Sequence, residues 1–199
     1  MKKLIPFSTP LRNASIALIR DVEPADRHLL KAGFEHLSDQ SRYFRFLGVH
    51  PRLSRSELTN FTAANDTNHV AIGAVIQDGE EVLPVGIARY VRQSDQSSLA
   101  EIAVTIVDDC QGLGLGSLLL GVLSKYAFVN GLTGFTALVH VDNEQMLGLL
   151  AQLGGTQSRV GGSEIEFHLP IFEDAADCPD NTLGDAYRTA YGLAEFTET

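Results

Sequence analysis

Residues 104–121 read VTIVDDCQGLGLGSLLLG, which places a strand, a glycine-rich turn and a helix in immediate succession. Glycine at positions 112, 114 and 116 lets the backbone take positive φ and approach a ligand closely, because it has no Cβ. The first amides of the following helix have no partner within it and lie at the positive end of its dipole. The stretch therefore predicts an anion-binding turn suited to phosphate.

Two common glycine motifs do not fit this spacing. A dinucleotide-binding fingerprint needs GxGxxG, but its third glycine falls on Ser117 when counted from Gly112 and on Leu119 when counted from Gly114. A nucleoside-triphosphate loop needs a lysine after its last glycine, and no lysine follows these glycines. The spacing excludes both interpretations.

Length and composition are those of one globular domain. The chain has 199 residues, of which 44% are hydrophobic and 20% are charged. We expect a domain over residues 1–172 and an acidic tail over residues 173–199, which hold one Lys or Arg against seven Asp or Glu. The tail is expected to be loosely attached, with a helix near its end.

The net charge of −10 argues against nucleic-acid binding and suits a cationic partner, although solubility explains it equally well. No apolar run approaches the ~20 residues of a membrane span, and no signal peptide is recognised. Cys110 and Cys178 have neither metal-binding nor disulfide spacing, and the histidines form no zinc motif. We expect a cytoplasmic protein without a metal, and the sequence leaves its oligomeric state open.

The first third of the chain predicts a strand at residues 13–22 and a helix over residues 24–37. The next segment is rich in arginine and aromatic residues and is expected to be a loop. Two interpretations of this loop stay open: it faces a substrate or a phosphate, or its rings anchor it while its arginines are solvated. Ser54 and Glu57 have the spacing of a capping box and predict a helix start.

Residues 69–109 predict three antiparallel strands, the last of which leads into the glycine turn. The helix from Gly116 to about Asn130 is apolar nearly all round and should be largely buried. A strand at residues 135–141, a helix after Asn143 and a closing hairpin over residues 156–170 follow. The order predicts an α/β (α+β) fold with a mixed, mainly antiparallel central sheet flanked by helices.

The glycine turn has the form Gln-x-x-Gly-x-Gly, which resembles the acyl-coenzyme A signature of the GNAT family of N-acetyltransferases. Asn143 at a helix start, Leu153-Gly154 at its end and the order of elements over residues 13–170 strengthen the resemblance. Within that family the chain is most similar to bacterial protein-lysine acetyltransferase (Pat-type) catalytic domains. The residues that carry this finer likeness are Ser38, Ser41, Tyr43, Arg45, Phe46 and the Ala100-Glu101 pair.

The resemblance implies acetyl-CoA as cosubstrate and an amine, a protein lysine or a small molecule, as acceptor. The coenzyme A pyrophosphate would be bound by the backbone of Gln111, Gly112, Leu113, Gly114, Leu115, Gly116 and Ser117. The pantetheine arm would pair with the strand edge formed by Val104, Thr105 and Ile106. Asn143 would hydrogen-bond that arm and also cap its own helix.

Glu101 is the candidate general base. A lysine of pKa ~10.4 is neutral in only about 1 molecule per 10³ at pH 7, a deficit of roughly 4 kcal/mol, so the reaction needs a base. Alternation along LAEIAVTIV places Glu101 on one face with Ala103 and Thr105. A carboxylate of ordinary pKa is a poor base, so we expect Glu101 to be partly desolvated or to act through water. Without the resemblance, an exposed carboxylate on a half-solvated sheet face is the favoured interpretation of Glu101. The resemblance reverses this preference, because it implies a catalytic role for the position ten residues before Gln111.

The chain departs from the family pattern at Leu150, where many members have a tyrosine that protonates the leaving thiolate. A thiol of pKa ~8.5 is a tolerable leaving group, so this change favours direct amine attack with Glu101 as base. Cys110 has no context that supports an acyl-enzyme. Two other hypotheses stay open: a catalytically weak acyl-CoA-binding or regulatory module, and an interaction protein that works through the acidic tail.

Overall fold

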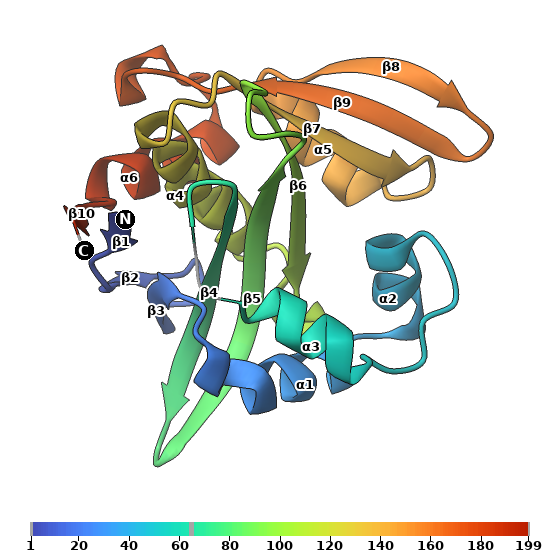
Figure 1. The fold of residues 1–199 in the computed structure, drawn as a ribbon. Helices are drawn as coiled ribbons and strands as arrows, with labels where there is room; N and C mark the ends of the chain where they lie inside the picture. Colours follow the sequence, from blue (N-terminus) through green and yellow to red (C-terminus); the bar gives the residue numbers. More distant parts are fainter. Residues whose placement is uncertain (1, 64–65, 199) are drawn as a thin grey trace.

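Eight strands form the main sheet in a computed structural model that describes residues 2–63 and 66–198, apart from the side chains of residues 159–160. The strands are ordered β2-β3-β4-β5-β6-β7-β9-β8, and every neighbouring pair is antiparallel except β6 and β7 (Figure 1). The bounds are β2 (Phe7–Pro10), β3 (Ile16–Asp21), β4 (His69–Asp78), β5 (Glu81–Arg92), β6 (Leu99–Ile106), β7 (Gly134–His140), β8 (Thr156–Gly161) and β9 (Glu164–Pro170). The predicted mixed, mainly antiparallel sheet is confirmed.

Helices cover both faces of this sheet. The described helices are α1 (Arg27–Glu35), α2 (Asp39–Phe46), α3 (Arg55–Phe61), α4 (Leu115–Val129), α5 (Glu144–Gln152) and α6 (Thr182–Leu193). On one face α4 packs so closely on β5 that a Cβ at Gly86 would lie 3.2 Å from both Leu115 and Leu119. On the other face Gly33 of α1 lies against Pro84 of β5. No described helix is long and apolar enough to cross a membrane.

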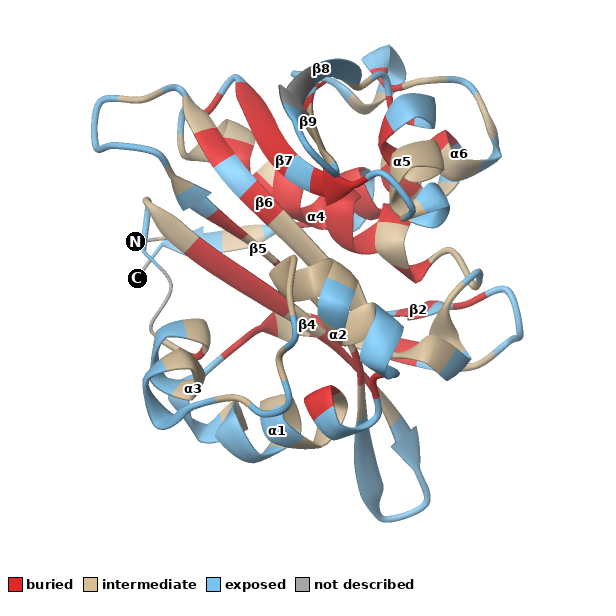
Figure 2. Cartoon of the chain, turned by 90° about the vertical axis from the view of Figure 1, so that its right-hand side faces the viewer, coloured by how far each residue is buried: buried red, intermediate tan, exposed pale blue. Residues whose placement is uncertain are grey.

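The strands β4, β5 and β6 alternate between these two faces, as their sequence predicts. Residues that point toward α4 form the core, and they include Val70, Ile72, Ala88, Tyr90, Ala100 and Ile102. The opposite face, covered by α1, α2 and α3, carries the residues between them in sequence and is only partly apolar. Figure 2 shows the buried core running along the strands beneath α2.

Three expectations about the first 60 residues need correction. Residues 41–46 belong to helix α2, not to a loop, because Ser38 caps the helix by accepting a hydrogen bond from the Ser41 amide. The helix expected over residues 24–37 begins as a 3-10 turn at Pro24–Asp26 and ends at Glu35. Two short strands, β1 (Lys2–Leu4) and β2, were not predicted, because strands of three or four residues carry almost no periodicity.

Helix α3 confirms the predicted capping box. The Ser54 hydroxyl accepts from the Glu57 amide, and the Glu57 carboxylate accepts from the Ser54 amide at 2.7 Å.

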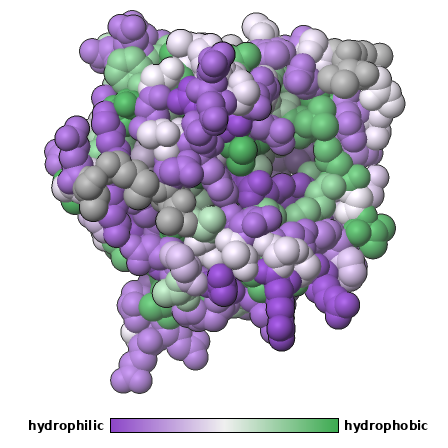
Figure 3. Space-filling view, viewed as in Figure 1, coloured by the Kyte–Doolittle hydropathy of each residue, from purple (hydrophilic) through white to green (hydrophobic). Residues whose placement is uncertain are grey.

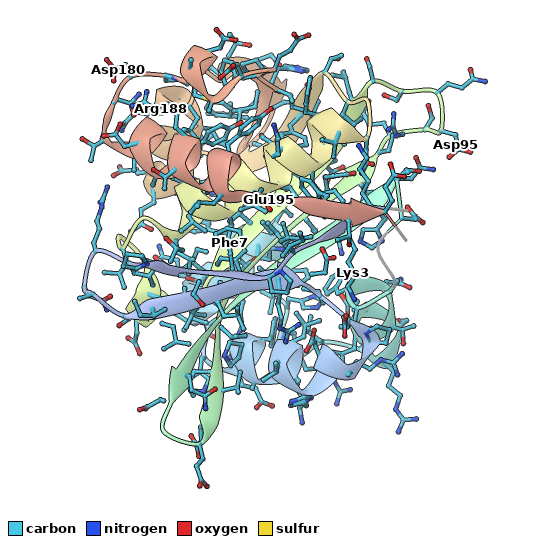
Figure 4. All side chains as sticks on the ribbon, turned by 90° about the vertical axis from the view of Figure 1, so that its left-hand side faces the viewer. Lys3, Phe7, Asp95, Asp180, Arg188 and Glu195 are labelled. Atoms are coloured by element: carbon cyan, nitrogen blue, oxygen red, sulfur yellow. The ribbon has the colours of Figure 1, made fainter. Side chains whose placement is uncertain are left out.

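The acidic C-terminal segment is packed on the domain, contrary to the expected loose attachment. Side chains at a helical spacing, Tyr187, Ala190 and Tyr191, are buried against α4, while the acidic residues lie on the outside. Figure 4 shows Arg188 on this outer side near Asp180, with which it forms an ion pair of 3.3 Å. The last strand, β10 (Phe196–Glu198), pairs with β1. The domain boundary at residue 172 stays a prediction.

One carboxylate joins α2 to the segment before the glycine turn. Asp108 accepts hydrogen bonds from the Ser38 amide at 3.0 Å and from the Ser38 and Ser41 hydroxyls at 2.7 and 2.9 Å. Partial burial opposes ionisation of this group, but these hydrogen bonds outweigh burial and hold the pKa of Asp108 below its usual value. Asp108 therefore fixes the start of α2 beside residues 111–117.

Replacing Gly121 tests the packing of α6. A Cβ at position 121 would overlap the Tyr187 carbonyl oxygen, so Gly121→Ala should lower the free energy of unfolding by about 1 to 3 kcal/mol. The measurement is urea denaturation. Gly192→Ala in α6 is the control: its Cβ would meet open space, so stability should stay unchanged or rise by up to about 1 kcal/mol. Equal denaturation midpoints for both variants would contradict the described contact between α4 and α6.

A second prediction concerns pH. Because the pKa of Asp108 is lower in the folded state, its contribution to stability is present above the unfolded pKa of ~3.9 and is lost as pH falls through the folded pKa. Asp108→Asn should lower the free energy of unfolding by about 1 kcal/mol at pH 7, and the difference from wild type should shrink toward pH 3. The exposed neighbour supplies the control, Asp109→Asn. If Asp108→Asn lowers the free energy of unfolding equally at pH 7 and pH 3, the negative charge of Asp108 does not contribute to stability.

Candidate functional site

The parallel strands β6 and β7 separate soon after they meet. They pair only at Leu99 with Gly134, Ala100 with Phe135 and Glu101 with Thr136. Beyond these pairs β6 continues to Ile106, while β7 continues beside β9. The separation leaves one edge of β6 without a strand partner after Glu101.

The open edge of β6 presents the polar backbone groups of every second residue. The Val107 amide, just beyond β6, donates to the Val85 carbonyl of β5 at 3.0 Å, and the Ile106 carbonyl on the other side accepts from Gln111 Nε2 at 3.2 Å. With a period of two residues, the amide and carbonyl of Val104 face the same side as those of Ile106. An extended ligand can therefore pair with β6 at Val104.

The glycine turn follows directly. Gly112 has φ +72° and Gly114 has φ +87°, a region that residues with a Cβ enter only at a cost of about 1–2 kcal/mol. Gly114 is also the N-cap of α4, and the first bond into the helix runs from the Leu118 amide to the Gly114 carbonyl at 3.1 Å. The preceding amides, of Leu115, Gly116 and Ser117, have no helical acceptor. The turn has the geometry of an anion site at a helix N-terminus.

A groove of about 610 Å³ joins the open edge of β6 to the glycine turn. It passes between α2 and α5, where Figure 3 shows the surface hollowed. The predicted site residues that line it are Glu101, Val104, Thr105, Ile106, Gln111, Gly112, Gly114, Gly116, Ser117 and Asn143. Leu113 and Leu115 do not line it, because their side chains pack against the core. The structure thus brings together predicted residues that are up to 42 positions apart in the sequence.

Asn143 lies at the start of α5 and Leu150 lies near its end. Asn143 is the N-cap and accepts a hydrogen bond from the Met146 amide at 3.2 Å through its Oδ1, so its amide nitrogen is left for a ligand. Leu150 is seven positions after Asn143 and is fully buried in the core, where it also forms part of the groove wall. The residues described as lining the groove include no tyrosine and no cysteine.

Glu101 lies where the groove begins, on the same face of β6 as Ala103 and Thr105, which also line it. Its side chain is exposed, so of the two expected routes to a base, desolvation and action through water, the geometry matches the second. Cys110 lies outside the groove lining, and burial, together with the charge of Asp109, raises the pKa of its thiol. A raised pKa lowers the thiolate fraction and makes Cys110 a poor nucleophile.

Sequence reasoning missed several residues that shape the groove. Arg12 donates to the Gly112 carbonyl at 3.2 Å, and the Arg12 amide donates to the Leu113 carbonyl, so the N-terminal segment holds the turn. Leu183 of α6 also lines the groove. No local pattern could reveal either contact, because Arg12 is 100 positions from Gly112. Phe44 and Arg45 of α2 also line the groove. The arginine-rich and aromatic sequence of that segment was consistent with one of its two predicted roles, facing a substrate or a phosphate.

Comparison with known proteins identifies the family. The sequence model of the acetyltransferase (GNAT) family matches residues 30–154. The chain is 33% identical over 137 residues to the acetyltransferase PA5475 of Pseudomonas aeruginosa, in a match that covers 69% of this chain and 73% of that protein. It is 31% identical over 169 residues to the acetyltransferase Pat of Mycolicibacterium smegmatis, covering 79% of this chain and 48% of Pat. The chain therefore spans about half the length of Pat.

Solved structures of acetyltransferases support the same family assignment. The GNAT domain of S. lividans PAT superposes with a TM-score of 0.75 at 26% identity, over 83% of this chain and 96% of that domain. A cAMP-binding acyltransferase from Mycobacterium smegmatis superposes with a TM-score of 0.61 at 25% identity, over 96% of this chain and 56% of that protein. With the family match covering more than half of the chain and relatives named acetyltransferase, this protein belongs to the GNAT family and is an N-acetyltransferase.

Proposed function

We propose that the protein transfers the acetyl group of acetyl-CoA to a primary amine by direct attack, with Glu101 as general base. The observation that carries this proposal is the position of Glu101 at the last pair between β6 and β7. A thioester at the end of an arm paired with Val104 would lie close to this point, so one strand would position both the arm and the base.

The residues of the groove fit acetyl-CoA as the substrate that the family uses. The unpaired amides of Leu115, Gly116 and Ser117 suit the pyrophosphate, because several converging amides add their small contributions of ~0.3 to 1 kcal/mol each. Gln111 contributes less directly: its amide caps the Ile106 carbonyl and contacts the Ser41 hydroxyl, which orients the turn. The free amide nitrogen of Asn143 suits a carbonyl of the pantetheine arm.

The acceptor amine must lose a proton before it attacks. An exposed carboxylate can accept that proton through a water molecule that also contacts the incoming amine. The amine nitrogen then bonds to the acetyl carbon and releases its second proton to solvent, the carbon–sulfur bond breaks, and the thiolate takes a proton from solvent. Leu150 cannot supply this proton, and the ordinary thiol pKa of ~8.5 makes a protein acid unnecessary.

A protein lysine is one acceptor that we propose, on the basis of the likeness to Pat-type domains. A small amine is the other. The second candidate function is an acyl-CoA-binding module with weak catalysis, which Leu150 and the exposed position of Glu101 favour. Both functions require the same groove, so binding and turnover must be measured separately.

Gly114→Ala tests the coenzyme site. An alanine at φ +87° is strained by about 1–2 kcal/mol, so the turn should relax and its amides should no longer converge. We expect the Kd for coenzyme A, measured by calorimetry, to rise about 5- to 30-fold. Gly148→Ala is the control, because its Cβ would meet open space on α5. An unchanged Kd for Gly114→Ala would contradict a pyrophosphate site at this turn.

Glu101→Gln tests the base. We expect kcat to fall about 10²- to 10⁴-fold, the usual contribution of general-base catalysis, while the Kd for coenzyme A stays unchanged. Acetyl-CoA turnover is measured against a panel of proteins and small amines, with Glu81→Gln at the exposed hairpin between β4 and β5 as control. Wild-type turnover in Glu101→Gln would remove Glu101 from the mechanism. Coenzyme A binding without turnover on any acceptor would favour the binding module.

A further inference from the structure

Three polar side chains share the sheet face that carries Glu101. Across β4, β5 and β6, the pairs His69 with Val91, Val91 with Glu101 and Arg89 with Ala103 place His69, Arg89 and Glu101 on one face. Arg89 and Glu101 are diagonal neighbours, a spacing that long side chains can bridge. This face is covered by α2 and α3, and Arg45 enters from α2.

Arg45 and Arg89 are two cations that lie on the same aromatic ring and have no hydrogen-bond acceptor or counter-ion among the described residues. The guanidinium carbons lie 5.8 Å and 4.4 Å from the centroid of the same ring, Phe61 of α3. Neither guanidinium forms a hydrogen bond or an ion pair within residues 2–63 and 66–198, and Arg89 Nη1 is completely buried. A buried donor without an acceptor costs about 1–3 kcal/mol, and more when it is charged.

Burial and the neighbouring Arg89 lower the pKa of Arg45 to about 10, and burial lowers that of Arg89, but a guanidinium stays protonated at pH 7. His69 Nε2 is also buried without a partner, and burial together with Arg89 lowers the pKa of this ring. The site is therefore an excess of positive charge in a partly dehydrated position.

The nearby carboxylates do not neutralise this pair. Glu57 is engaged at the start of α3, where it accepts from Ser54 and lies 3.0 Å from His50 Nε2. Glu101 attracts both arginines, yet it forms no ion pair with either of them within the described part of the chain. Two guanidiniums facing one unpaired carboxylate leave room for one further negative charge.

The pair lies at the junction of two spaces. A largely apolar cavity of about 100 Å³, between the sheet and α1–α3, is lined by Arg45 and Arg89. Arg45, Ala103 and Thr105 line both this cavity and the groove, so the two spaces adjoin beside Glu101. A ligand in the groove that carries an anionic group next to its reacting atoms could place that group on the arginines.

We propose that Arg45 and Arg89 form a binding site for a carboxylate carried by one of the two substrates. A planar guanidinium binds a carboxylate through two parallel hydrogen bonds. A lysine in its place could not donate this pair of bonds, and a ligand with a neutral amide in place of the carboxylate could not accept both. The carboxylate can come from the acceptor, as in an amino acid, or from a dicarboxylic acyl group on coenzyme A. The apolar cavity suits an aliphatic side chain of such an amino acid.

This inference rests on the proposed function for the place of the reacting atoms, and direct binding tests it. Calorimetry on the full chain compares succinyl-CoA with acetyl-CoA, and N-acetyl-L-leucine with N-acetyl-L-leucinamide in the presence of coenzyme A. One of the two acids should bind about 10- to 100-fold more tightly than its neutral counterpart, the strength of a charge-assisted pair. A preference in the first comparison assigns the carboxylate to the acyl group, and one in the second assigns it to the acceptor.

Variants locate the preference. Arg89→Gln and Arg45→Gln should each abolish it, Arg89→Lys should weaken it, and Arg55→Gln, an exposed change on α3, should leave it intact. No preference in either wild-type comparison, or a preference that persists in Arg89→Gln, overturns the proposal. The wild-type comparison decides even if a variant does not fold.

Turnover separates this inference from the proposed function. Acetylation of neutral amines and amino acids at equal rates, together with no carboxylate preference in binding, would overturn the inference alone. A carboxylate preference in binding without turnover on any acceptor would uphold the inference and contradict the proposed enzyme mechanism.

Discussion

A strand edge cannot pair with a neighbouring strand and with a ligand at the same time, and this constraint organises the molecule. β6 is joined to β7 just long enough to keep the sheet continuous and is then released. β7 remains fixed because its other edge pairs with β9 over seven residues, from Gly134 to His140. The backbone groups of β6 that have no partner on β7 are available to pair with a ligand.

The glycine turn is held by contacts from distant parts of the chain. Arg12 donates to the Gly112 carbonyl of the turn, and Asp108, just before the turn, accepts hydrogen bonds from Ser38 at the start of α2. Gly114 gives the turn its conformation, and these tethers restrict it to that conformation without occupying the amides at the start of α4. An anion site arranged in advance loses less entropy on binding than a mobile loop would.

Local patterns predicted what local physics determines. Alternation gave the meander, an apolar run gave the buried helix α4, and the spacing of Ser54 and Glu57 gave the start of α3. The glycine spacing identified the groove. The packing of α6 and the tether by Arg12 depend on residues 66 and 100 positions apart, such as Gly121 with Tyr187 and Arg12 with Gly112, and no sequence period encodes such contacts. The acidic composition of residues 173–199 led to the wrong expectation of loose attachment. An acidic helix can still pack on the domain when its apolar side chains lie on one face and its charges on the other.

The pairing of β1 with β10 brings the two ends of the described chain side by side, with Lys2 opposite Glu198. Figure 1 shows these ends on the side of the molecule away from the gap between α2 and α5. Ends that meet can be joined by a short linker, and the chain can be reopened at an exposed hairpin such as the one after Asp78. The architecture thus tolerates circular permutation in principle, and any fused protein would begin far from the groove.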